Sequence, residues 1–132
     1  MNELFSNVDC VELYVDNLEE GLRYYRDCLG LKLLWRTNTF AGLGMTGDIT
    51  EIVLQTERQA LNVDFKVESV EEAVRAITAA GGEVISAPFD IPIGKCAVVR
   101  DPWQNEYVIL DMSKGRYKTD ETGHVTGVVP NG

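Results

Sequence analysis

Four short stretches of the chain carry acidic side chains in alternation with apolar ones. They are VELYV around Glu12, TEIVLQ around Glu51, NVDFKV around Asp64 and NEYVIL around Glu106. A carboxylate that folding removes from water becomes a stronger base, so it could take a proton from a carbon beside a carbonyl group. A carboxylate that stays ionised could instead attract an organic cation. The residue types therefore leave two chemistries open, proton transfer and cation binding.

The elements that must position these side chains occur twice. Residues 11–30 (VELYVDNLEEGLRYYRDCLG) align with residues 63–82 (VDFKVESVEEAVRAITAAGG) after a shift of 52 positions. The six identical pairs are Val11/Val63, Val15/Val67, Glu19/Glu71, Glu20/Glu72, Arg23/Arg75 and Gly30/Gly82. An internal repeat of this kind indicates a duplicated structural module.

Each copy predicts a strand, a helix and three further strands. Apolar residues at every second position of 11–15 and 63–67 are typical of half-buried strands. Asn17 and Ser69, each with a glutamate three residues later, are capping signals for the helices that follow. The remaining strands are expected at 31–36, 42–45 and 50–56 in the first copy and at 83–86, 95–99 and 105–112 in the second.

Polar or proline-containing segments separate and follow these elements. TERQAL, at 56–61, links the two copies. PFDIPIGK, at 88–95, is expected to be a rigid connector because it holds two prolines, although its apolar residues could instead form a pocket wall or a dimer seam. Residues 115–132 are polar and glycine-rich and have no sustained periodicity, so we expect a mobile or surface-draped tail.

In this order the pieces resemble the vicinal-oxygen-chelate superfamily of glyoxalases, bleomycin-resistance proteins and extradiol dioxygenases. The resemblance rests on VDCVELYVDNLEEGLRYYRDCLGLKLL, AAGGEV and DPWQNEYVILD. It implies an α+β fold in which two βαβββ modules form an open cup. The predicted single domain is 1–114, with module one at about 1–58 and module two at about 61–114, followed by the polar tail at 115–132.

The resemblance also implies where a metal would bind, because metal-dependent members of the family place ligands on the first and last strands of each module. Here those places carry Cys10, Val53, Asn62 and Val108. Valine offers no donor atom, so this set cannot hold a divalent ion, and we predict a domain with no metal and no cofactor. One alternative stays open, a metal site formed by Cys10, Glu51 and Glu106 after a register slip in the last strands.

Side-chain alternation predicts which residues share the face of the implied cup. We expect the ligand-binding residues to be Cys10, Tyr14, Trp35, Glu51, Val53, Gln55, Asn62, Asp64, Lys66 and Val108. Trp35 and Tyr14 could stack on a cation. Glu12 and Glu106 are the predicted catalytic carboxylates.

Two functions fit such a lining. The first, implied by resemblance to the bleomycin-resistance proteins, is binding of a small amphipathic or cationic compound without metal. The second is a metal-free lyase or isomerase of the glyoxalase type, in which Glu12 or Glu106 removes a proton from a small carbonyl compound while Lys66 or Tyr14 stabilises the enolate. The family resemblance further implies a homodimer.

Bulk properties exclude other classes of partner. The formal net charge of -9 repels phosphate backbones, so we expect no nucleic-acid partner. The first residues lack a basic flank and a long apolar run, and no stretch of eighteen apolar residues occurs, so neither secretion nor a membrane is expected. Three widely spaced cysteines indicate reduced thiols and a cytoplasmic protein.

Overall fold

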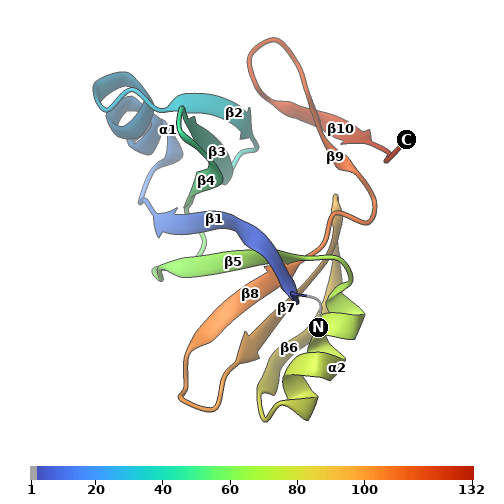
Figure 1. Cartoon of the computed structure of the whole chain (residues 1–132). Coiled ribbons are helices and arrows are strands. Elements are labelled where there is room, and N and C mark those ends of the chain that lie inside the picture. The colour runs from blue at the N-terminus through green and yellow to red at the C-terminus, as the bar shows by residue number, and fades with distance from the viewer. Residues whose placement is uncertain (1–2) are drawn as a thin grey trace. The chain divides into compact units, whose positions relative to one another are not determined.

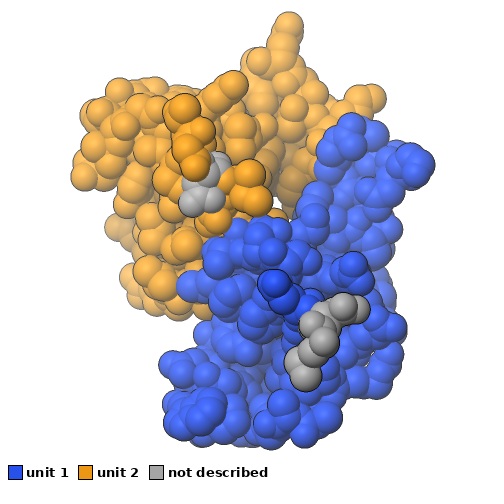
Figure 2. Space-filling model, in the orientation of Figure 1, with its two compact units in different colours: residues 1–8, 63–116, 128–132 blue, residues 9–62, 117–127 orange. Residues whose placement is uncertain are grey.

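The computed structural model describes residues 3–132, which divide into two compact units (Figure 2). Of the described residues, unit 1 takes 3–8, 63–116 and 128–132, and unit 2 takes 9–62 and 117–127. Each unit holds one of the two strand–helix–three-strand modules, which confirms the predicted α+β class and the βαβββ repeat. None of the helices in the described part of the chain is long and apolar enough to span a membrane.

Unit 2 contains the first module (Figure 1). Its elements are β1 (Phe5–Tyr14, from residue 9 on), α1 (Leu18–Leu22), the π-helix η1 (Arg23–Cys28), β2 (Lys32–Arg36), β3 (Phe40–Met45) and β4 (Asp48–Gln55). The strand order is β2-β3-β4-β1, in which β1 runs parallel to β4 and the other pairs are antiparallel. The helix begins as predicted, since Asn17 Oδ1 accepts a hydrogen bond from the Glu20 amide at 3.0 Å.

One face of the unit 2 sheet packs against the helix, and the other carries the polar residues. The buried cluster on the helix side comprises Leu18, Leu22, Ala41, Leu43 and Leu54. Leu13 of β1 packs against this cluster, and Leu54 of β4 belongs to it. Their neighbours alternate to the opposite face, where the parallel register pairs Cys10 with Glu51 and Glu12 with Val53. The predicted alternation is therefore confirmed for this unit.

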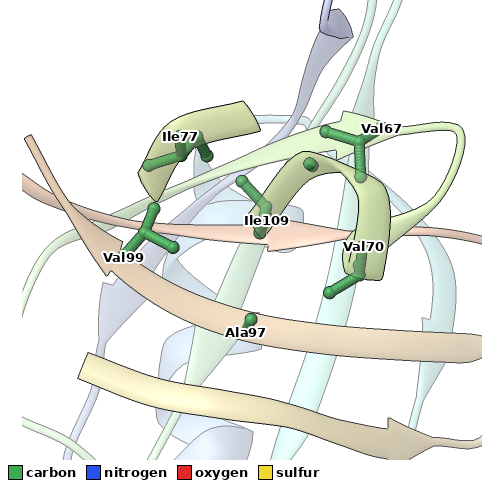
Figure 3. Close-up of a cluster of buried hydrophobic side chains, with 7 residues drawn as sticks. Val67, Val70, Ile77, Ala97, Val99 and Ile109 are labelled. Carbon is green, nitrogen blue, oxygen red and sulfur yellow. The ribbon is translucent and has the colours of Figure 1, made fainter. Parts of the chain in front are cut away.

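Unit 1 contains the second module. Its elements are β5 (Asn62–Val67, from residue 63 on), α2 (Val70–Ala79), β6 (Glu83–Ile91), β7 (Gly94–Arg100) and β8 (Glu106–Leu110), with the strand order β5-β8-β7-β6. Side chains of α2 meet those of β7 and β8 in a buried cluster (Figure 3); its members are Val67, Val70, Ala73, Ile77, Ala97, Val99 and Ile109. Phe5 stacks on Phe65 with 4.4 Å between the ring centroids, which explains why the first residues belong to this unit.

Two segments are more regular than their sequences predicted. Strand β6 continues through Pro88 to Ile91, so the expected connector at 88–95 is mostly strand. Proline is tolerated there because β6 lies at the end of the strand order, where its outer edge has no partner strand among the described residues, and its register shifts between Ser86 and Phe89.

The segment expected to be a mobile or surface-draped tail contains two strands. Arg116–Thr119 forms β9 and Val125–Val129 forms β10, and the two strands pair as a hairpin. Asp120 fixes the turn, since its Oδ1 accepts hydrogen bonds from the amides of Thr122 and His124. These local bonds hold the polar segment in order without the apolar periodicity that normally indicates a strand.

The buried carboxylate of Asp111 links separate segments of unit 1 by hydrogen bonds. Asp111 is 3% exposed and accepts hydrogen bonds from the amides of Val70 and Lys95, each at 3.0 Å, and from the hydroxyl of Ser113 at 2.7 Å. Burial acts to raise the pKa of Asp111, but the hydrogen bonds from Val70, Ser113 and Lys95 outweigh it, so the pKa lies below its usual value. The stabilisation is therefore present above the unfolded pKa and is lost as the pH falls through the folded one.

Replacing Asp111 by alanine should lower the free energy of unfolding by about 3 kcal/mol at neutral pH, because several buried donors lose their acceptor. Urea unfolding measures this loss, and Glu68→Ala, at an exposed carboxylate of the same unit, is the control. The difference between wild type and Asp111→Ala should shrink as the pH falls below about 4, the ordinary aspartate value. A loss that stayed constant down to acid unfolding would contradict the assigned role of the carboxylate.

Candidate functional site

A bulge in β2 brings two large apolar side chains to the polar face of unit 2. The register between β2 and β3 shifts at Leu34, so this residue is an extra one in its strand. A one-residue bulge places neighbouring side chains on the same face of a sheet. Beneath them β3 carries Gly42 and Gly44, and the indole of Trp35 lies over Gly42 while Leu34 lies over Gly44.

The indole reaches across Gly42 to a carboxylate on the next strand. Trp35 Nε1 donates a hydrogen bond to Glu51 Oε1 at 2.7 Å. The ring of Tyr117, from β9, packs on Trp35 with 4.9 Å between the centroids and planes tilted by 37°. All three side chains are partly buried. We call Trp35, Glu51 and Tyr117 the Glu51 site.

The surroundings change the acidity of both titratable members of this site. Burial raises the pKa of Glu51, and the negative charge of Asp9 adds to that effect, while the hydrogen bond from Trp35 acts against it. Burial also raises the pKa of Tyr117, helped by the charges of Glu51 and Asp9. The carboxylate is therefore a stronger base than an ordinary glutamate, and the phenol stays protonated at neutral pH.

The hairpin that supplies Tyr117 is attached to β2. The amide of Arg36 donates to the carbonyl of Gly123 at 2.8 Å, and the guanidinium of Arg36 pairs with Glu19. Sequence reasoning missed Tyr117 because its segment was expected to be a tail. The signal that could have found it is the short alternating stretch RYKT, followed by a turn that contains Asp120 and Gly123.

The other predicted residues of unit 2 have partners near the end of β4. Glu12 is 5% exposed and pairs with Arg58 at 3.6 Å. Gln55 Oε1 accepts from the amides of Glu57 and Arg58, each at 2.8 Å, so its side chain holds the following turn. The hydrogen bond to Asp16 is the main reason that the pKa of Tyr14 is raised. These contacts leave Glu12 and Gln55 less available to a ligand than Glu51. Glu12 is buried, as a desolvated base would be, but its carboxylate is paired with Arg58.

The predicted residues of unit 1 lie on β5 and β8. The parallel register pairs Asp64 with Val108 and Lys66 with Leu110. Glu106, at the start of β8, pairs with Arg100 at 2.7 Å, and its side chain is 46% exposed. The structure therefore shows Glu106 as a surface ion pair, which suits neither the predicted catalytic base nor the alternative metal site with Cys10 and Glu51.

The four family metal positions do not fit a divalent ion. Val53 and Val108 are 5% and 4% exposed, and each is a buried side chain with only methyl groups to offer. Cys10 lies in β1, and Asn62 is the first residue of β5. Since half of the positions lack a donor atom, no step of the chemistry proposed below passes through a metal at these positions.

Comparison with known protein families shows which family has this fold. The sequence profile of the Glyoxalase/Bleomycin resistance protein/Dioxygenase superfamily matches residues 7–109. The chain therefore belongs to this superfamily, whose members include vicinal-oxygen-chelate proteins. Comparison with curated protein sequences gives no significant match.

Solved structures show the same fold at low sequence identity. Methylmalonyl-CoA epimerase from Mycobacterium tuberculosis has a TM-score of 0.72 at 14% identity, over 84% of this chain and 91% of that one. NAD-dependent benzaldehyde dehydrogenase from Legionella pneumophila has a TM-score of 0.66 at 23% identity, over 78% and 97%. Homoprotocatechuate 2,3-dioxygenase from Brevibacterium fuscum has a TM-score of 0.62 at 23% identity, over 82% of this chain and 37% of that one. These likenesses establish the fold alone.

Gly42→Ala should break the Glu51 site, because a Cβ atom would collide with the indole of Trp35 and lie 2.6 Å from Glu51 Oε1. We expect a loss of about 2 kcal/mol in the free energy of unfolding. The fluorescence of Trp35 should shift to longer wavelength in a Trp103→Phe background, where Trp35 is the only tryptophan.

The matched control for this substitution is Gly47→Ala, because a Cβ atom at Gly47 meets no other atom within 4 Å. Equal stability and equal emission in the two variants would show that Gly42 does not hold the indole against Glu51.

Proposed function

We propose that the Glu51 site binds a small organic cation without a metal, so that this chain is a small-molecule binding member of its superfamily. The observation that carries the proposal is a partly buried carboxylate beside two packed aromatic rings. A cation placed against Glu51 would offset the cost of keeping that charge away from water. Aromatic faces attract cations within about 6 Å of the ring centre, which adds to the attraction.

The charge of the whole chain supports the same class of ligand. The formal net charge of -9 draws cations toward the protein and repels anionic metabolites. Within unit 2, Asp9 acts on both Glu51 and Tyr117, so a second carboxylate contributes to the negative potential at the site. A small cation with an apolar body therefore fits the site better than a neutral or anionic compound does.

A second candidate is favoured by one specific observation, the raised pKa of Glu51. A carboxylate with that property could remove a proton from the carbon next to a carbonyl group, and a protonated phenol such as Tyr117 could donate a hydrogen bond to the enolate oxygen. This metal-free lyase or isomerase would use Glu51 in place of the predicted Glu12 and Glu106. Proton exchange between pyruvate and heavy water, followed by NMR with wild type and Glu51→Gln, separates this activity from cation binding.

We also propose that the chain is a cytoplasmic homodimer, as the family resemblance implies. Strand β6 supports an association surface, since Val84, Ile85 and Phe89 are 38%, 41% and 45% exposed on it. Sedimentation of the purified chain should give twice its mass of 14.7 kDa, and Phe89→Ser should shift the population toward monomer. A monomer at all concentrations would refute the dimer.

Glu51→Gln should weaken binding of choline by about tenfold or more, because the ligand loses a charged partner in a partly desolvated site. Trp35 fluorescence in the Trp103→Phe background reports the binding. Glu68→Gln, which changes the net charge equally at an exposed position, should bind choline as wild type does. The uncharged isostere 3,3-dimethylbutanol should bind more weakly than choline and should not respond to Glu51→Gln. Equal choline affinity in both variants would refute the proposal.

The same substitution should raise the melting temperature at pH 7. Since the folded pKa of Glu51 is raised, its contribution to stability is complete below the unfolded pKa and is lost as the pH rises through the folded value. Glutamine keeps an acceptor oxygen for Trp35 but carries no charge. The gain over wild type should therefore disappear as the pH falls below about 4.3, the ordinary glutamate value. Choline binding by the wild type should weaken over the acid range in which Glu51 takes up its proton.

A further inference from the structure

We propose that the ligand of the Glu51 site is a cation with an apolar chain, and that the chain lies on a ledge formed by Leu34 and Ile49. This inference rests on the proposed function and adds the shape of the ligand to its charge. The two side chains are 39% and 78% exposed; Leu34 belongs to β2 and Ile49 to β4, the strand that carries Glu51.

Leu34 connects the ledge to the site. Because of the bulge in β2, Leu34 and Trp35 lie on the same face, over Gly44 and Gly42 of the neighbouring strand. Glycine at both positions lets the two side chains lie close to the sheet. Glu51 Oε1 is 2.6 Å from the place where a Cβ of Gly42 would be, so the carboxylate belongs to the same face. An apolar group bound at Leu34 would therefore extend directly from a cation held at Glu51.

Ile49 continues the apolar surface at the end of the β3–β4 hairpin. It precedes Glu51 by two residues in β4, so the two side chains lie on the same face of the strand. Single exposed apolar side chains need no explanation, but a group of them beside a buried charge is typical of a binding surface. Lys32, which pairs with Gly44 in the register, borders this end, and its methylene groups can add to the apolar contact.

The charge of Glu51 and the apolar surface beside it together indicate the class of ligand. A carboxylate at one end of a surface and exposed aliphatic groups at the other are complementary to an amphipathic cation. A compact cation such as choline would satisfy Glu51 and leave the ledge in water. A neutral apolar compound would contact the ledge and leave Glu51 unpaired.

Alkyltrimethylammonium ions from tetramethyl to octyl, each below its micelle concentration, test the ledge by titration of Trp35 fluorescence in the Trp103→Phe background. Affinity should rise with chain length by up to about fourfold for each methylene buried. In Leu34→Ser and in Ile49→Ser the dependence on length should flatten, while the affinity for tetramethylammonium should stay as in wild type. Ile49 is mostly exposed, so its substitution should leave the fold intact.

Leu29→Ser is the matched control, because Leu29 is 52% exposed at the end of η1 and outside the ledge. It should keep the full dependence on chain length. If tetramethylammonium binds and Glu51→Gln removes that binding, but longer chains bind no better, the ledge is refuted and the cation site stands. A length dependence that survives in Leu34→Ser and Ile49→Ser would also refute the ledge. Absence of binding by every cation would refute the proposed function and, with it, this inference.

Discussion

The Glu51 carboxylate is kept partly out of water by the indole of Trp35, which donates a hydrogen bond to Glu51 Oε1 at 2.7 Å. That arrangement depends on Gly42, since any Cβ at this position would occupy the space of the indole. It also depends on the bulge at Leu34, which turns Trp35 toward the polar face, and on the hairpin that brings Tyr117 onto the ring. The hydrogen bond between Trp35 and Glu51 therefore depends on residues of β2, β3 and β4 and on the β9–β10 hairpin.

This interaction has opposite consequences for stability and for binding. A carboxylate with a raised pKa carries its negative charge at a cost to the folded state. The same desolvation strengthens its attraction for a cation, because a charge acts more strongly where water cannot screen it. Asp111 in unit 1 illustrates the contrary case, since its hydrogen bonds lower the pKa and stabilise the fold. The groups around each acid therefore suit Glu51 to binding a cation and Asp111 to stabilising the fold.

Membership of the superfamily accounts for the fold, whereas the chemistry of the site depends on individual side chains. The places that the family resemblance implies for metal ligands include Val53 and Val108, which are buried and have no donor atom. The polar face of unit 2 carries Glu51, whose pKa is raised mainly by burial and which pairs with Cys10 in the register of β1 and β4. Proteins with the same fold can carry sites of different function, because strand pairing depends mainly on the backbone whereas a site depends on a few side chains.

The sequence by itself determined the modules, the helix starts and the side-chain alternation of the strands that have no bulge, because alternation, capping and duplication act over short distances along the chain. It also predicted Trp35 and Glu51 as ligand-binding residues. Only the tertiary structure decided that these two are hydrogen-bonded, that Glu12 and Glu106 pair with arginines instead, and that Tyr117 joins the site. The physical reason is that strand register, a one-residue bulge and the docking of a hairpin are set by contacts between distant segments, and local patterns do not record such contacts.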